Sequence, residues 1–299
     1  MSPPLFALPQ PPLQRLDLPW LHMAGVEAAI LRLDLIDPLI SGNKWFKLQH
    51  HLRAAEQAGA PGLISLGGNH SNHLHALAAA GRRFGFATAG LLRGHRQDTP
   101  TVHDLQALGM ELHWLGYGGY RARHEPDFWQ PWQARYPAWH CIPEGGGGEA
   151  GAQGCLQIVE QARAQLASVG WSDYTAWWLA VGTGTTLAGL VLAEQGAHPV
   201  HGALAVPRDH GVERTVAQLA GASGYRLHAA SRGGFARLDD ELLEFISASE
   251  RHCGVPLEAL YTGKALLALR EQVGAGLFAP GSRLIFVHTG GLQGRRGYL

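Results

Sequence analysis

Two of the few lysines in this chain stand one helical turn apart, beside a glycine and an asparagine. The 299 residues contain three lysines against 21 arginines. Lys44 and Lys47 lie in residues 41–47, SGNKWFK, at the start of a predicted helix. A lysine amine can form an imine with a carbonyl compound, and a second lysine one turn on could neutralise a phosphate. The alternative is a helix-capping asparagine followed by two solvated lysines.

A second polar motif, residues 67–81 (GGNHSNHLHALAAAG), follows a short apolar strand. Ser71 or Asn72 would cap the helix that begins there, and the free N–H groups of a helix start suit a carboxylate or a phosphate. An ordinary strand–turn–helix with polar caps is the alternative. The segment also holds His70, His73 and His75. No carboxylate or cysteine stands nearby at ligand spacing, so we expect no metal site.

A glycine–threonine loop, residues 181–189 (VGTGTTLAG), separates a predicted strand from a predicted helix. Such a loop forms a nest of backbone donors for a dianionic phosphate, although a simple packing loop is the alternative. Its glycine spacing differs from the dinucleotide-binding fingerprint, and no acidic residue follows about 20 positions on, so a dinucleotide-binding reductase is disfavoured. Residues 260–269 (LYTGKALLAL) and 286–294 (FVHTGGLQG) could each line a pocket, but each motif alone is weak.

Predicted strands alternate with predicted helices, which favours an α/β fold with mostly parallel sheets. We expect strands at 28–34, 62–66, 86–92, 111–115, 138–142, 175–181, 200–206 and 283–288. We expect helices at 43–58, 71–84, 101–108, 120–135, 155–167, 187–195, 239–252 and 262–273. The glycine motifs fall where strands end, which is the edge at which open α/β sheets bind ligands. The glycine-rich segment 144–154 is predicted to be a loop and a boundary between subdomains.

Composition excludes several classes of protein. The formal net charge is zero, which argues against a nucleic-acid or anionic-membrane partner. Hydrophobic residues make up 46% and charged residues 16%, which is too apolar for a disordered chain. The uncharged stretch 174–193 contains GTGTT, so we expect strand, loop and helix rather than a membrane span. The proline-containing residues 1–12 do not resemble a secretory signal, and the three cysteines form no CxxC pair, so we expect a cytoplasmic protein with reduced thiols.

Together and in this order, the motifs resemble the fold-type II pyridoxal-phosphate enzymes, in the branch of aminocyclopropane-carboxylate deaminase and D-cysteine desulfhydrase. GNKWFKL is similar to the family's GNKxRKL, GGNHSNH to GGxQSNH, YTGKA to YTGKA and HTGG to HTGG. The resemblance spans roughly residues 30–295. It implies pyridoxal 5'-phosphate as cofactor and two α/β domains, each an open, mostly parallel sheet flanked by helices. Residues 1–48 and 155–299 would form the larger domain, and residues 49–154 the smaller, inserted one.

The resemblance also implies a role for individual residues. Lys44 would bond to the cofactor aldehyde, and Asn72 would hydrogen-bond the phenolic oxygen. Ser71 would lie by the substrate carboxylate, Tyr261 against cofactor and substrate, and Thr289 by the pyridine nitrogen. The phosphate would be held by Lys47, Gly182, Thr183, Gly184, Thr185 and Thr186. Of these residues, Lys44, Ser71 and Tyr261 would be catalytic.

Two positions favour the desulfhydrase side of this branch. Thr262 and Thr289 stand where ring-opening deaminases typically have glutamate. The resemblance thus implies a lyase that eliminates sulfide from D-cysteine, giving pyruvate and ammonia, and family members are usually homodimers. Ring opening of 1-aminocyclopropane-1-carboxylate, another amino-acid lyase or racemase activity, and a cofactor-binding protein without catalysis are the alternatives. Departures from the family pattern at Phe46, His70 and His75 leave the amino-acid substrate open.

Overall fold

The computed structural model describes residues 8–234 and 236–297, and its strands form two sheets. The first sheet has six strands in the order β1-β2-β10-β7-β8-β9, and the second has four in the order β5-β4-β3-β6. The strands are β1 (Leu13–Arg15), β2 (Glu27–Arg32), β3 (Gly62–Gly67), β4 (Ala87–Leu92), β5 (Glu111–Trp114), β6 (His140–Cys141), β7 (Ala176–Val181), β8 (Val200–Leu204), β9 (Tyr225–Ala229) and β10 (Arg283–His288). The pairing of β1 with β2 is antiparallel, and the other strand pairs are parallel.

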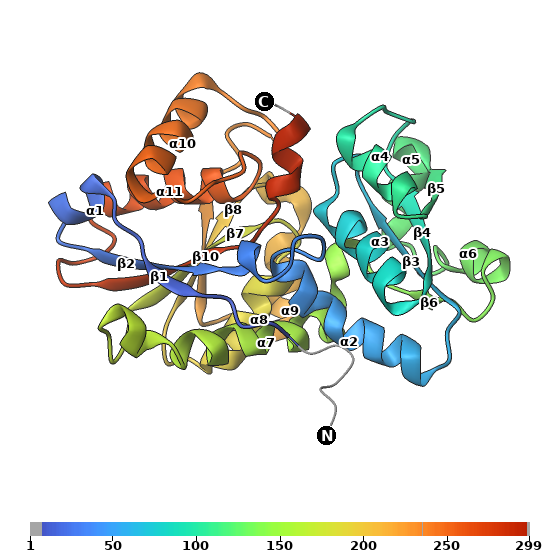
Figure 1. Ribbon diagram of the computed structural model, residues 1–299, viewed down its shortest axis with the longest axis horizontal. Helices are drawn as coiled ribbons and strands as arrows, with labels where there is room; N and C mark the ends of the chain where they lie inside the picture. Colours follow the sequence, from blue (N-terminus) through green and yellow to red (C-terminus); the bar gives the residue numbers. More distant parts are fainter. Residues whose placement is uncertain (1–7, 235, 298–299) are drawn as a thin grey trace.

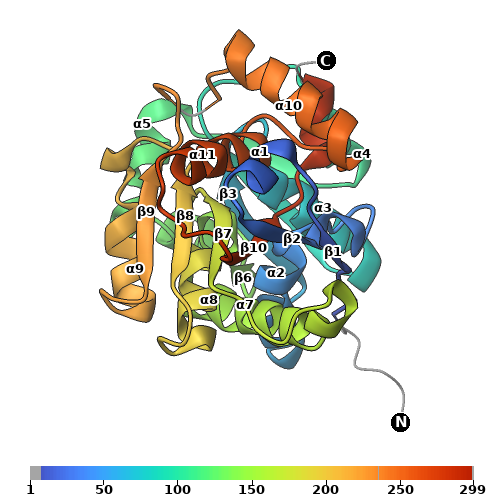
Figure 2. The same cartoon turned by 90° about the vertical axis from the view of Figure 1, so that its left-hand side faces the viewer.

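Helices flank both sheets, as predicted for an α/β fold. They are α1 (Pro19–Met23), α2 (Asn43–Gln57), α3 (Asn72–Phe84), α4 (Pro100–Ala107), α5 (Gly116–Arg121), α6 (Gln130–Arg135), α7 (Gly148–Arg163), α8 (Thr185–Glu194), α9 (Val212–Ala220), α10 (Asp240–Cys253) and α11 (Thr262–Gly274). Figure 1 shows the six-stranded sheet on the left and the four-stranded sheet on the right, with α2 running between them. In Figure 2, α1, α10 and α11 lie above the larger sheet and α7, α8 and α9 below it.

The central strands of the larger sheet are buried on both faces, and their sequences are correspondingly apolar. Strand β7 reads AWWLAV and is buried at every position. Side chains of a strand alternate between faces, so Trp177 and Leu179 pack into the core on the α7 and α8 side, whereas Trp178 packs toward α11. A strand covered on both faces needs a continuous apolar run, and this pattern is what identifies a parallel core strand.

Three expectations from the sequence need correction. The helix predicted over 120–135 is interrupted between α5 and α6, because Pro126 cannot continue a helix and disfavours helical backbone at the residue before it. The predicted loop 144–154 is largely the first part of α7. Strands β1 and β9 and helices α1 and α9 were not predicted, because they lie in proline-, glycine- or arginine-rich segments without a clear hydrophobic period.

Two other expectations concern membranes and the chain start. Residues 174–193 form β7, a loop and most of α8, as predicted. No helix in the described ranges has the length and apolar character needed to cross a membrane. Residues 1–7 of the N-terminal segment lie outside the described residues.

The glycines of segment 144–154 serve helix packing. A Cβ on Gly154 would lie 1.9 Å from the carbonyl oxygen of Phe46, so α7 approaches the backbone of α2 directly. A Cβ on Gly189 of α8 would lie 2.6 Å from the carbonyl oxygen of Ala152, so α8 approaches α7 in the same way. These contacts hold α2, which carries both lysines, against the helices below the larger sheet. The proposed division into residues 1–48 with 155–299 and residues 49–154 stays a prediction.

We predict that Gly154→Ala destabilises the protein by about 1–3 kcal/mol, because the new methyl group must displace backbone rather than a flexible side chain. Gly274→Ala is the matched control, since a Cβ there meets nothing within 4 Å. We expect the control to change stability by less than about 1 kcal/mol. Urea unfolding of both variants gives the comparison, and equal midpoints would contradict close backbone packing at Gly154.

Candidate active site

A cavity of about 710 Å³ opens where β3, β7 and β10 end, and it gathers residues from both sheets. The sequence-predicted site residues that line it are Lys44, Lys47, Ser71, Asn72, Gly182, Thr183, Gly184, Thr185, Thr186, Tyr261 and Thr289. His70 lines it as well. Phe46 does not line the cavity, because its side chain is fully buried in the core. His75 does not line it either, and its Nε2 lies 3.4 Å from Oδ2 of Asp104. Of the three departures from the family pattern, only His70 therefore faces the cavity.

Lys44 presents its amine to this cavity from the first turn of α2. Its Nζ donates to Oδ1 of Asn43 at 2.9 Å, and Nδ2 of Asn43 donates to Oγ1 of Thr186 at 2.8 Å. Burial lowers the pKa of Lys44 well below its usual range, and the charge of Lys47 adds to the effect. A lysine in this state favours the neutral amine, which can attack a carbonyl or accept a proton. The alternative of two solvated lysines after a capping asparagine is wrong, since the N-cap is Gly42.

Lys47 reaches the glycine–threonine loop. Its Nζ donates to the carbonyl of Gly145 at 3.3 Å and to Oγ1 of Thr183 at 3.5 Å, and burial lowers its pKa to about 8. Both of these partners are neutral, so the buried ammonium would gain from an anion beside it. The loop turns into α8 at Gly184, whose φ of +86° favours glycine. Lys47 and the N-terminus of α8 together suit a phosphate.

Ser71 and Asn72 open α3 on the other side of the cavity. Oγ of Ser71 accepts from the backbone N–H of Leu74 at 3.2 Å, which caps the helix. Nε2 of Gln293 donates to Oδ1 of Asn72 at 2.7 Å, which orients the amide so that Nδ2 is the group that can donate to a ligand. Sequence reasoning missed Gln293, although it stands in the motif at 286–294.

Tyr261 precedes α11, and its ring lies over the glycine–threonine loop at residues 182–186, called the phosphate loop below after its proposed role. A Cβ on Gly182 would lie 3.1 Å from the ring, so any larger residue there would have to push the ring of Tyr261 away. Buried Glu258 accepts from the backbone N–H groups of Leu260 and Tyr261, both at 2.8 Å, and of Thr262 at 2.5 Å. Burial raises the pKa of Glu258 to about 7. Glu258, which the sequence did not single out, thus fixes the backbone that carries Tyr261.

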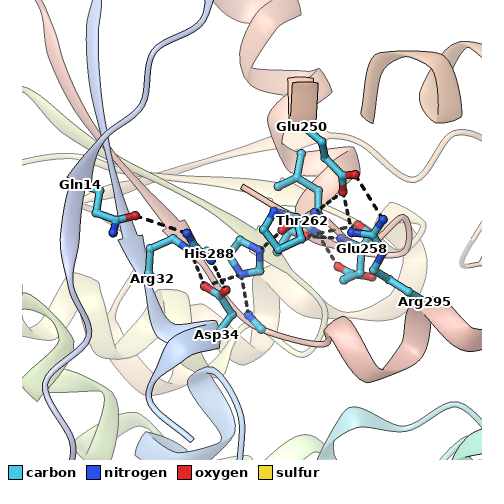
Figure 3. Close-up of polar contacts among 11 residues, drawn as sticks. Gln14, Arg32, Asp34, Glu250, Glu258, Thr262, His288 and Arg295 are labelled. Carbon is cyan, nitrogen blue, oxygen red and sulfur yellow. Dashed lines mark hydrogen bonds and ion pairs between the residues drawn. The ribbon is translucent and has the colours of Figure 1, made fainter. Parts of the chain in front are cut away.

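A buried polar network surrounds His288, the residue that precedes Thr289 (Figure 3). Arg32 donates to both oxygens of Asp34, at 2.8 and 2.6 Å. Nδ1 of His288 lies 3.3 Å from Asp34, and its Nε2 donates to the carbonyl of Pro256 at 2.8 Å. The backbone N–H of Gly290 donates to Nδ1 of His288 at 3.2 Å. The bonds of His288 to Pro256 and Gly290 fix the turn at residues 288–290, and the N–H of Asn43 at the start of α2 donates to the carbonyl of Thr289 in that turn.

With this geometry established, comparison with known proteins identifies the family. A family model described as "Pyridoxal-phosphate dependent enzyme" matches residues 9–290, so the chain belongs to that family and uses pyridoxal phosphate. The chain is 25% identical over 318 residues to 1-aminocyclopropane-1-carboxylate deaminase of Mesorhizobium japonicum, covering 96% of this chain and 94% of that protein.

Two further similarities agree with this assignment. The chain is 26% identical over 318 residues to the mitochondrial bifunctional D-cysteine desulfhydrase/1-aminocyclopropane-1-carboxylate deaminase of Arabidopsis thaliana, covering 95% of this chain and 76% of that protein. The crystal structure of an ACC deaminase homologue matches with a TM-score of 0.82 at 24% identity, covering 99% of this chain and 93% of that one. The fold-type II expectation is thereby confirmed.

The residues of the cavity fit the cofactor of this family. Lys44 is an amine whose pKa is lowered, Lys47 is a buried cation with neutral partners, and α8 begins at a glycine turn. Lys44 would hold the cofactor aldehyde. Lys47 and the loop at 182–186 would hold the phosphate, and Asn72 would donate to the phenolic oxygen.

We predict that removing Asp34 destabilises the protein. Asp34→Ala would leave the guanidinium of Arg32 buried without its carboxylate, at a cost of about 3–5 kcal/mol. The control is Asp17→Ala, which removes an exposed pair with His22 and should cost less than about 1 kcal/mol. Chemical denaturation of both variants tests this, and similar losses would show that the network does not stabilise the turn.

A second prediction concerns phosphate binding by Lys47. Pyridoxine 5'-phosphate has the cofactor's phosphate without its aldehyde, so its binding is independent of imine formation. Since the pKa of free Lys47 is about 8, affinity should fall by up to about tenfold per pH unit above that value.

Lys47→Met supplies the control for this titration. The variant should bind pyridoxine 5'-phosphate more weakly, and its affinity should lack the part of the pH dependence that Lys47 causes. Calorimetric titration between pH 7 and 10 measures both proteins. Identical pH profiles would refute the assignment of Lys47 to the phosphate.

Proposed function

We propose that the protein catalyses α,β-elimination from a small amino acid, with D-cysteine as the simplest substrate. One D-cysteine and one water would give pyruvate, ammonia and hydrogen sulfide. The proposal rests on the amine of Lys44, which burial disfavours as a cation and which lines the cavity. It also rests on Thr289, which lines the same cavity and stands directly before the last Gly-Gly of the sequence, where a ring-opening enzyme would have glutamate. Thr262 begins α11 where a ring-opening enzyme would be expected to have glutamate.

The cofactor, when bound, supplies an aldehyde that bonds to amines and a ring that withdraws electrons from the carbon beside the amine. Lys44 would remove the proton from that carbon, and the low pKa of its amine leaves Nζ ready to accept it. Ser71 and the start of α3 would hold the substrate carboxylate, because helix N-termini favour anions. The hydroxyl of Thr289, unlike a carboxylate, would not stabilise a proton on the pyridine nitrogen, which favours elimination over transamination.

Tyr261 would close the cavity beside the substrate. Its ring packs over Gly182, and Glu258 fixes its backbone, so the phenol is held close to the phosphate loop. In this position it would orient the amino acid so that the bond to the α-proton faces Lys44. Orientation of this kind accounts for a large part of enzymatic rate enhancement.

Ring opening of 1-aminocyclopropane-1-carboxylate is the second candidate, because both relatives described above carry that activity in their names. The products separate the two reactions. Elimination from D-cysteine releases sulfide and pyruvate, whereas ring opening releases 2-oxobutyrate without sulfide. Assay of both substrates, together with a panel of D- and L-amino acids, decides between these reactions and other lyase or racemase activities.

We predict that Lys44→Ala lowers turnover by about 10³-fold or more, since it removes both the cofactor bond and the base. The variant should also lack the visible absorbance of a cofactor joined to a lysine. Gln57→Ala, an exposed substitution at the end of the same helix, is the control and should retain both properties. Full activity of the Lys44 variant would overturn the proposed mechanism.

A further inference from the structure

The cavity carries more positive charge than the proposed reaction uses. The lysine and arginine side chains that line it are Lys44, Lys47, Arg93, Arg121 and Arg123, and the one lining carboxylate among the described residues is Glu144. Nε of Arg123 donates to Glu144 at 2.8 Å, and the hydroxyl of Tyr120 donates to the other carboxylate oxygen at 2.5 Å. Glu144 is therefore already neutralised by Arg123.

The two remaining arginines share one wall of the cavity. Arg93 directly follows β4, and its guanidinium lies 5.8 Å from the centre of the Tyr117 ring. Tyr117 and Arg121 are four residues apart on α5, so both lie on the same face of that helix. Within residues 8–234 and 236–297, neither Arg93 nor Arg121 forms an ion pair with a carboxylate.

The position of this wall distinguishes it from the groups that would hold the cofactor and the α-carboxylate. Lys47 reaches the loop at residues 182–186, and Ser71 caps α3, whereas Arg121 ends α5 and Arg93 directly follows β4 of the smaller sheet. The backbone there is fixed, because Nδ2 of Asn69 donates to the carbonyl of Arg93 at 3.3 Å. His70 and His124 line the same cavity.

We infer that the preferred substrate is an amino acid whose side chain ends in a second anionic group, a carboxylate or a phosphate, bound by Arg93 and Arg121. This inference rests on the proposed elimination and specifies its substrate class. Guanidinium groups bind carboxylate and phosphate oxygens with paired, charge-assisted hydrogen bonds, which makes two unpaired arginines selective for such groups.

The chemistry balances for a phosphate ester of serine. The α-proton passes to Lys44, the bond between the β-carbon and oxygen breaks, and its electron pair leaves with the phosphate. One water is consumed on the way to pyruvate and ammonia. D-cysteine, which lacks the second anion, is turned over with a lower kcat/KM.

Isosteric pairs of amino acids test the inference directly. Aspartate and asparagine, and glutamate and glutamine, differ in charge but hardly in shape, and none has a good leaving group on its β-carbon. Binding of each enantiomer to the holoenzyme is measured by calorimetry. We expect at least one acid to bind about tenfold to a hundredfold more tightly than its amide.

The double variant Arg93→Gln/Arg121→Gln should lose this preference, whereas Arg96→Gln should retain it. Arg96→Gln removes one positive charge nearby, against two in the double variant, from a guanidinium that lies 5.8 Å from the centre of the Trp114 ring and does not line the cavity. Elimination from O-phosphoserine and O-acetylserine, assayed as keto acid, gives the second comparison. The kcat/KM of the phosphate ester should fall at least about tenfold in the double variant, with little change for the acetate ester.

The outcomes separate this inference from the proposed function. Equal binding of acids and amides, or the same loss in the Arg96 variant, overturns the inference even if D-cysteine is eliminated. Conversely, selective binding of the acids with no elimination from any amino acid supports the anion site and refutes the proposed reaction.

Discussion

The site depends on the burial of two amines one helical turn apart. Lys44 and Lys47 repel each other, and burial penalises both ammonium forms, so the pair is unfavourable unless at least one becomes neutral or meets an anion. The two lysines relieve this repulsion by reaching different groups. Lys44 points at neutral Asn43, whereas Lys47 extends to the loop at 182–186, where a phosphate would balance its charge. One lysine is thereby suited to chemistry and the other to anchoring.

Much of the surrounding packing follows from the need to hold α2 in that place. A Cβ on Gly42 would lie 2.1 Å from the carbonyl oxygen of Thr289, so the start of α2 touches the backbone of the last turn. The N–H of Asn43 donates to that same carbonyl at 3.1 Å. Arg32 and Asp34 lie beside His288, the first residue of this turn (Figure 3). The lysines and Thr289 therefore keep their relative positions through backbone contacts rather than through long side chains.

Sequence patterns predict the residues that line the cavity better than the residues that support them. The alternation of strands and helices, and the positions of the motif residues at strand ends, follow from hydrophobic periodicity and glycine patterns. Glu258 and Gln293 could not be found in this way, because the partners of Glu258 are backbone groups and Asn72, the partner of Gln293, lies far away in the chain. Asp34 stands two residues from Arg32, but nothing local indicates that both are buried beside His288. Asn43 stood inside a motif, yet its bond to Thr186 across 143 residues had no local signal. The helical start of α7 was missed because its glycines, which weaken helices locally, are required by the contact with α2.

The two sheets contribute different kinds of groups to the cavity. Tyr261 and Thr289 adjoin the larger sheet, and the phosphate loop follows its strand β7, whereas His70, Arg93 and Arg121 belong to segments of the smaller sheet. Residues that support Tyr261 and Thr289 are buried and charged, so changing them costs stability. The arginines are exposed and lie at strand or helix ends, where substitutions are tolerated. If Arg93 and Arg121 bind the substrate side chain as proposed, substrate preference would vary with the smaller sheet while the larger sheet preserves the chemistry.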